Sequence, residues 1–143
     1  MQAYIRNLQT LGFKNIFGFD LRKDRAEEAF SKYRIDLIQN IDAALENKKF
    51  DIFIISVPPD KHHIYINKAI EKNIHFFVEA SVVDDGMDEI LDKLKSKELI
   101  AAPSSTLYFH PAIKMISDII KNGELGKITN ITYHSGQYLP DWH

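Results

Sequence analysis

The sequence predicts an α/β fold in which helices flank a parallel sheet. Short apolar runs alternate with amphipathic stretches along the chain, and this alternation is typical of parallel strands joined by right-handed helical crossovers. The segment 50–57, FDIFIISV, is almost entirely apolar, as expected of a strand buried on both faces of such a sheet. With 143 residues, of which 45% are hydrophobic, the chain is long enough to bury a core of its own but too short for two full domains.

The first third of the chain contains an opening helix, two short strands and a helix after each strand. Apolar residues recur at helical spacing from Tyr4 to Leu11, and Gly12 suits the C-terminal cap. The charged segment 22–34 carries one apolar face, which indicates an amphipathic helix. Asn40 is a suitable N-cap for the next helix. The pattern therefore predicts strands at 15–20 and 35–38 and helices at 4–11, 22–34 and 41–45.

The remainder of the chain repeats the alternation and then changes character. Pro58 and Pro59 end the strand at 50–57, and later elements are predicted as helices at 64–73, 86–97 and 111–123 and strands at 74–79 and 99–102, the latter ended by Pro103. The segment 127–133, KITNITY, instead alternates polar and β-branched residues, which predicts an antiparallel strand with one wet face. We therefore expect an incomplete nucleotide-binding type of domain over 1–122 and the start of a second domain over 123–143.

Composition excludes several classes of function. A net charge of -2 gives no electrostatic basis for binding nucleic acid or an anionic membrane, and the absence of Cys excludes disulfides, thiolate metal sites and a thiol nucleophile. Neither a signal peptide nor a membrane span is recognisable. The six His show no ligand spacing, so no metal site is expected. These features predict a soluble, cytoplasmic protein.

Ligands of open α/β sheets bind outside the carboxyl ends of the strands. In this chain the residues at the predicted strand ends are 20, 56–59, 79–81 and 103–106. Asp20 has the type and place of the carboxylate that accepts hydrogen bonds from two ribose hydroxyls in a dinucleotide site, although it could equally cap the following helix. His62 could face the same cleft or simply begin a helix. The 143 residues contain no first strand with a G-x-G-x-x-G turn, which would hold a pyrophosphate.

Three segments resemble the glucose-fructose oxidoreductase and inositol dehydrogenase (Gfo/Idh/MocA) family. They are FGFDLRKDRAEEAF, FIISVPPDKHHIYINKAIEKNIHFFVEAS and YFHPAIKMISDIIKNGELGKITNITY. The second contains a T-P-x-x-x-H-like turn at 57–62 and a V-E-K-P-like strand end at 78–81. The tail at 136–143 resembles a branch associated with cell-surface polysaccharide or sugar-nucleotide metabolism, or is a domain-linking loop with a buried Trp.

The resemblance implies a Rossmann-like sheet that lacks its first strand, a cofactor that is NAD or NADP, and a small sugar, cyclitol or sugar-nucleotide substrate. It implies cofactor-binding roles for Asp20 at the adenosine ribose, for Ser56, Val57, Pro58 and His62 in a loop lining the cofactor, and for Glu79 at the nicotinamide side. It also implies a homo-oligomer formed through the second domain. Hydride would move between a substrate carbinol carbon and the nicotinamide.

Two family positions differ in this chain. Ala80 replaces the lysine that serves the reacting hydroxyl, and Ser81 replaces the usual proline. A methyl group cannot do general acid–base work, so the catalytic group is unknown, with His110 as one candidate. We therefore expect the 143-residue chain to be inactive. The alternatives are a non-catalytic binding or assembly module and a flavodoxin-like or receiver-like regulatory domain.

Overall fold

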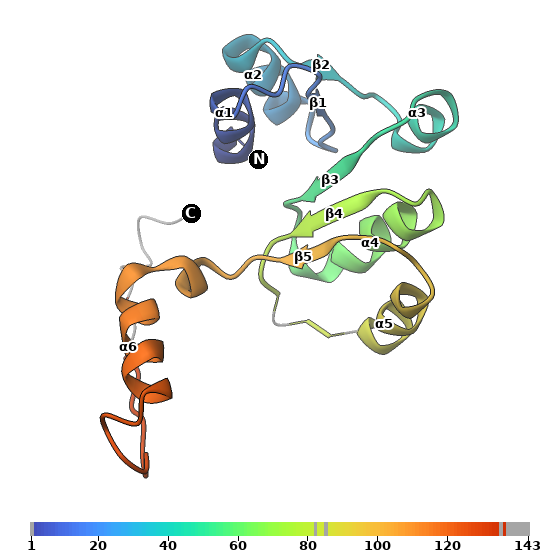
Figure 1. The fold of residues 1–143 in the computed structure, drawn as a ribbon. Helices are drawn as coiled ribbons and strands as arrows, with labels where there is room; N and C mark the ends of the chain where they lie inside the picture. Colours follow the sequence, from blue (N-terminus) through green and yellow to red (C-terminus); the bar gives the residue numbers. More distant parts are fainter. Residues whose placement is uncertain (1, 82, 85, 135, 137–143) are drawn as a thin grey trace. The chain divides into compact units, whose positions relative to one another are not determined.

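The computed structural model describes residues 2–81, 83–84, 86–134 and 136. The chain divides into two compact units, Met1–Ser104 and Ser105–His143, and each is described separately. Figure 1 shows helices and parallel strands alternating through the first unit. The α/β class predicted from the sequence is confirmed. The tail at 137–143 lies outside the described residues.

The strands of the first unit form two parallel sheets. Strand β1 pairs with β2, and β4 lies between β3 and β5 in a second sheet. The helix α1 precedes β1, α2 connects β1 to β2, and α4 connects β3 to β4 (Figure 1). The elements are α1 (Gln2–Thr10), β1 (Phe17–Gly18), α2 (Lys23–Tyr33), β2 (Asp36–Leu37), α3 (Ile41–Asn47), β3 (Ile52–Ile55), the 3-10 helix η1 (Pro59–Lys61), α4 (His62–Glu71), β4 (His75–Val78), α5 (Met87–Lys95) and β5 (Ala101–Pro103).

Local signals account for the helix boundaries. The Asn40 side chain accepts a hydrogen bond from the backbone N–H of Ala43 at 3.0 Å, which fixes the start of α3 as predicted. Gly12 has a φ of +88°, as expected of a left-handed residue just after a helix. The predicted end of the strand at 99–102 is wrong by one residue. Pro103 is itself the last residue of β5, opposite Val78, because an edge strand tolerates a residue without N–H.

Two apolar clusters form the core of this unit. The larger one joins β3 and β4 to α3, α4 and α5, and its buried members are Leu45, Ile55, Ile66, Ala69, Ile70, Ile74, Phe76 and Ile90. The smaller one joins α1, α2 and the start of β2 through Ile5, Ala29 and Ile35. Gly18 packs closely against this cluster, because a Cβ at that position would lie 2.7 Å from Cδ1 of Ile35 and would force that side chain to shift.

The two sheets do not join. No backbone pairing links β1 to β3 among the described residues. The rings of Phe17 in β1 and Phe50, just before β3, make an edge-to-face contact with centroids 5.6 Å apart. Because β3 is an edge strand, Ile52 is 50% exposed, and the prediction that 50–57 is buried on both faces is wrong at that end.

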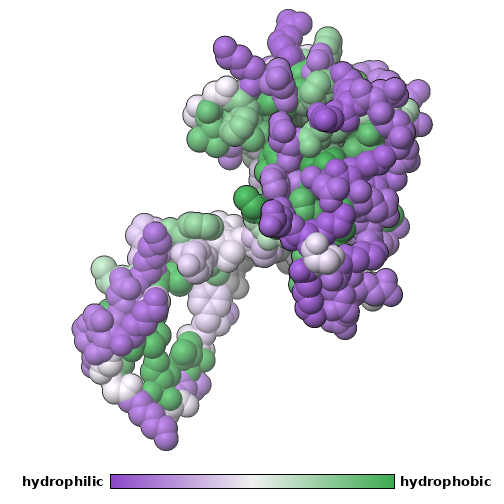
Figure 2. Space-filling view, turned by 45° about the vertical axis from the view of Figure 1, so that its right-hand side comes forward, coloured by the Kyte–Doolittle hydropathy of each residue, from purple (hydrophilic) through white to green (hydrophobic). Residues whose placement is uncertain are grey.

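The second unit contains the 3-10 helix η2 (Thr106–Phe109) and α6 (Pro111–Lys121). Pro111 occupies the first turn of α6 as predicted, because that position needs no N–H donor. The predicted strand over 127–133 is not formed, and no other segment pairs with it among the described residues. A strand requires a hydrogen-bonded neighbour, so polarity alternation alone does not create one. Figure 2 shows hydrophobic residues on the surface of this unit. Ile131 and Tyr133 are among its exposed hydrophobic residues.

Candidate functional site

A hollow at the carboxyl end of the strands brings together two of the predicted site residues. Asp20 follows β1 and Ser56 follows β3, and both line a cavity of about 300 Å³ with Gln2, Arg25 and Glu28. This volume is at the lower end of the range of about 300–1,000 Å³ usual for small-molecule sites. Gln2 is the first residue of α1, so the start of that helix also borders the cavity. The adenosine ribose site predicted from Asp20 thus has a physical cavity beside it.

The Asp20 side chain bonds to the backbone just before α2 and does not cap that helix, whose N-cap is Arg22. Its Oδ1 accepts a hydrogen bond from the backbone N–H of Arg22 at 2.9 Å, just before α2. An ionised carboxylate has about four acceptor positions, so this bond leaves acceptor capacity for ribose hydroxyls. Asp20 can therefore order the start of α2 and bind a ribose with the same side chain.

Two arginines near Asp20 have different surroundings. The Arg22 guanidinium forms an ion pair with Asp24 at 2.5 Å, which raises the pKa of Arg22 and lowers the pKa of Asp24. Arg25 instead lines the hollow, three residues before Glu28 on α2. Helical spacing after Asp20 could have identified Arg25 and Glu28, whereas no local signal could have identified Gln2.

The turn after β3 contains the other residues predicted to line the cofactor. Ser56 and Val57 are partly buried and Pro58 is exposed. His62, the first residue of α4, is only 1% exposed, and its Nε2 lies 2.9 Å from the carbonyl oxygen of Val57. His62 does not line the hollow beside Asp20 and Ser56, and its side chain is held within the protein interior.

Glu79 directly follows β4, and its backbone N–H donates to the carbonyl of Ile55 at 3.1 Å. The Tyr4 hydroxyl of α1 donates a hydrogen bond to the Glu79 carboxylate. Burial, followed by that hydrogen bond and the charge of Glu79, raises the pKa of Tyr4 to about 12. The Tyr4 ring also packs against Phe77, with centroids 5.7 Å apart. Tyr4 therefore connects α1 to the strand end that carries the predicted nicotinamide-side residue.

The position of the family lysine offers no proton donor. Ala80 is exposed, and the adjacent Ser81 forms a local turn in which its Oγ accepts from the Val83 N–H at 3.0 Å. His110, proposed as a replacement, accepts a hydrogen bond from the Ala112 N–H at 3.2 Å and caps α6. Within the described part of the chain, no group of three or more His, Cys, Asp or Glu side chains could hold a metal ion. None of its helices is long and apolar enough to cross a membrane.

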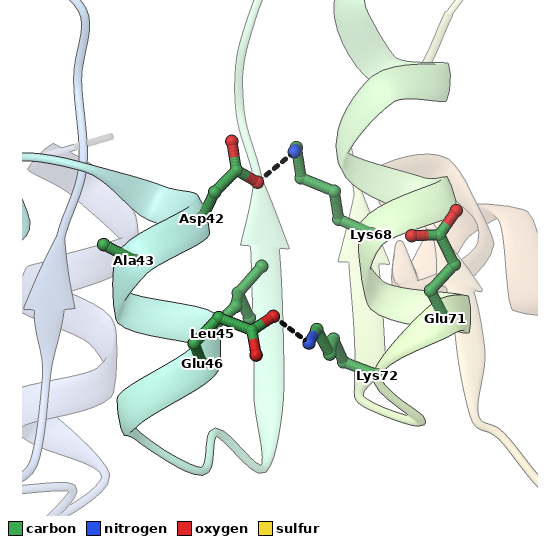
Figure 3. Close-up of a pocket in the computed structure, with 7 residues that line it drawn as sticks. All are labelled: Asp42, Ala43, Leu45, Glu46, Lys68, Glu71 and Lys72. Carbon is green, nitrogen blue, oxygen red and sulfur yellow. Dashed lines mark hydrogen bonds and ion pairs between the residues drawn. The ribbon is translucent and has the colours of Figure 1, made fainter.

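A second hollow, of about 400 Å³, lies between α3 and α4 (Figure 3). Asp42 forms an ion pair with Lys68, and Glu46 forms one with Lys72, so charges from the two helices face each other across it. None of the residues predicted to bind a cofactor or substrate lines this hollow. These pairs neutralise charge and link the two helices.

Comparison with known proteins agrees with this geometry. Residues 2–103 match the model of an oxidoreductase family with an NAD-binding Rossmann fold. Among curated proteins, a dTDP-3,4-didehydro-2,6-dideoxy-α-D-glucose 3-reductase of Saccharopolyspora spinosa is 22% identical over 120 residues, which cover 82% of this chain and 36% of the reductase.

Solved structures show the same fold. A putative NADPH-dependent oxidoreductase from Desulfitobacterium hafniense aligns with a TM-score of 0.75 and 22% identity, covering 87% of this chain and 38% of that one. A 3-ketoreductase from Actinomadura kijaniata, solved with NADP and TDP-benzene, aligns with a TM-score of 0.70 and 16% identity over 83% of this chain and 38% of the ketoreductase. This chain thus spans a little over a third of the length of these proteins.

The hollow contains the Asp20 carboxylate, which can accept hydrogen bonds, and the start of α1 borders the same space. The family match covers all the predicted site residues, from Asp20 to Glu79. The family binds NAD(P), and its model extends through β5. The chain therefore belongs to the Gfo/Idh/MocA family of oxidoreductases, whose hallmark is an NAD-binding Rossmann fold.

Proposed function

We propose that the protein to which this chain corresponds is an NAD(P)-dependent oxidoreductase acting on a sugar-nucleotide or related sugar derivative, and that residues 1–122 form its cofactor-binding part. The observation that carries the proposal is the convergence of Asp20, Ser56 and the start of α1 on one hollow at the carboxyl end of the strands. The substrate class is supported by the dTDP-sugar reductase and the 3-ketoreductase that the chain resembles.

The bound cofactor would accept or donate hydride, and the residues of this chain would bind and orient it. Asp20 would accept hydrogen bonds from the adenosine ribose, while Ser56, Val57 and Pro58 would line its path. Glu79, oriented by the Tyr4 hydroxyl, would lie toward the nicotinamide. Ala80 cannot transfer a proton, so the acid–base group must come from elsewhere. We accordingly propose that the 143-residue chain does not turn over substrate.

One observation favours a second candidate function, a non-catalytic binding or assembly module. The position of the family lysine is occupied by Ala80, whose exposed methyl group has no acid–base chemistry. A module of this kind would keep the sheet without using the hollow beside Asp20. The two functions therefore differ in whether Asp20 contributes to cofactor affinity.

Substitution of Asp20 tests the proposed function. The variant is made in an extended chain, defined as residues 1–143 preceded by an apolar strand and a G-x-G-x-x-G turn taken from a structural relative. Asp20→Ala should raise the Kd for NAD(H) by about 10- to 100-fold, because it removes the equivalent of one hydrogen bond to an ionised acceptor, worth about 1.5–3 kcal/mol. Isothermal titration calorimetry measures the change.

Asp24→Ala is the matched control for that experiment. It removes the same charge four residues later, and Asp24 pairs with Arg22 without lining the hollow. It should change the Kd by less than about threefold, as expected when a single surface ion pair is lost. An Asp20→Ala variant that binds either dinucleotide as tightly as the unmodified extended chain would refute the cofactor assignment.

We also propose a cytoplasmic homo-oligomer, in which 127–133 of two copies associate. Ile131 is 70% and Tyr133 64% exposed, and this segment has no strand partner among the described residues. A second copy would supply both apolar contact and backbone pairing. Light scattering at tens of micromolar should show a dimer or larger species, and Ile131→Lys should shift it towards monomer. Leu21→Lys, at an 82% exposed position in the first unit, should not. A stable monomer of the unmodified chain would contradict the proposal.

A further inference from the structure

His62 is the one buried polar side chain in the described core, and it lies directly behind the turn that carries Ser56 and Val57. It is 1% exposed and is the first residue of α4, which follows β3 and η1 along the chain. Its Nε2 is 2.9 Å from the Val57 carbonyl oxygen, and its Nδ1 is buried without a hydrogen-bond partner among the described residues. A polar ring is costly to bury, so its hydrogen bond must offset part of that cost.

The sequence of the turn explains why a side chain supplies this bond. Val57 is followed by Pro58 and Pro59, neither of which has a backbone N–H to donate. The first backbone bond that closes the turn runs from the Lys61 N–H to the Pro58 carbonyl at 2.9 Å. The partly buried Val57 carbonyl needs a donor, and His62 provides it from within the core.

The chemistry of the pair fixes the position of the proton. A carbonyl oxygen only accepts hydrogen bonds, so Nε2 must carry the hydrogen that lies between it and Val57. In the neutral ring Nδ1 is then the unprotonated nitrogen.

We propose that His62 is a positioning residue: its Nε2–H holds the Val57 carbonyl and thereby places Ser56 at the hollow, and it does not itself contact the cofactor. The role of this placement in cofactor binding rests on the proposed function. The hydrogen bond between His62 Nε2 and the Val57 carbonyl, called the clamp below, is a property of the protein without ligand. This role differs from that of a residue lining the cofactor, since His62 acts from the buried side of the turn.

Nuclear magnetic resonance of the 143-residue chain tests the clamp. Long-range proton–nitrogen correlation should show Nε2 of His62 as the protonated nitrogen and Nδ1 as the unprotonated one at neutral pH. His62→Leu fills the site without a donor and should accelerate hydrogen exchange of the Lys61 amide by about 10- to 100-fold relative to the Ile74 amide, as expected for losing one buried bond of about 1–3 kcal/mol. The Ile74 N–H donates to the Ala69 carbonyl at the far end of α4 and reports the stability of the helix itself.

His62→Gln is the conservative variant, because its amide can donate to the same carbonyl. It should restore the exchange ratio and the Ser56 amide resonance that His62→Leu displaces. Equal acceleration at Lys61 and Ile74 would mean a structural role only and would overturn the proposal, as would a tautomer protonated at Nδ1. Since the tautomer is read on the unmodified chain, the test holds even if His62→Leu does not fold. Loss of Asp20 dependence in the extended chain would refute the proposed function but leave the clamp intact.

Discussion

The 143-residue chain is expected to bind NAD(H) and NADP(H) with a Kd far above the micromolar range, and the extended chain at least about 100-fold more tightly. The chain contains no G-x-G-x-x-G turn, so the backbone N–H groups that would hold the pyrophosphate are not supplied by its residues. Two such charge-assisted hydrogen bonds, at about 1.5–3 kcal/mol each, account for a factor of 100 or more. Calorimetric titration of both proteins under the same salt conditions measures the difference.

A second extended chain separates the effect of the added strand on cofactor affinity from the effect of the glycine turn. It carries the same strand but an alanine at each glycine of the turn, so that it keeps the added strand without offering close backbone approach to a phosphate. Its affinity should stay near that of the 143-residue chain. Micromolar binding by the 143-residue chain itself would show that the hollow beside Asp20 is sufficient, contrary to this expectation.

Phe76→Ala is expected to lower the free energy of unfolding by about 3–5 kcal/mol, a large share of the total stability of a domain of this size. Phe76 is 4% exposed at the centre of the larger apolar cluster, on β4, between Phe53 of β3 and Ala101 of β5. Its removal deletes apolar contact and leaves a cavity that the paired strands cannot collapse into. Urea unfolding followed by circular dichroism measures the loss.

Leu91→Ala is the matched control. Leu91 lies on α5 and is 56% exposed, so truncation should cost less than about 1 kcal/mol. Equal losses for Phe76→Ala and Leu91→Ala would show that the cluster around β4 is not the stabilising core. The adjacent Ile90 is only 3% exposed, so burial on α5 differs sharply between neighbouring apolar residues.

Sequence patterns predicted most elements because local signals were strong. Asn40 capped a helix, Gly12 and Gly123 followed helix ends with positive φ, and apolar runs formed β3 and β4. Prediction failed for residues whose structure or burial depends on a neighbouring strand. The segment 127–133 has strand periodicity but no neighbour among the described residues, and Ile52 belongs to an apolar run but lies at a sheet edge.

The sequence by itself determined the α/β class, the family resemblance and the candidates Asp20, Ser56 and Glu79, because residue type and the order of strands fix what lies at the strand ends. Only the tertiary structure decided which groups surround them. It brought Gln2, Arg25 and Glu28 to the hollow, joined Tyr4 to Glu79, and turned His62 inward to the Val57 carbonyl. Contacts between residues far apart in sequence depend on how helices pack on the sheet, and packing is set by the shape of the whole core.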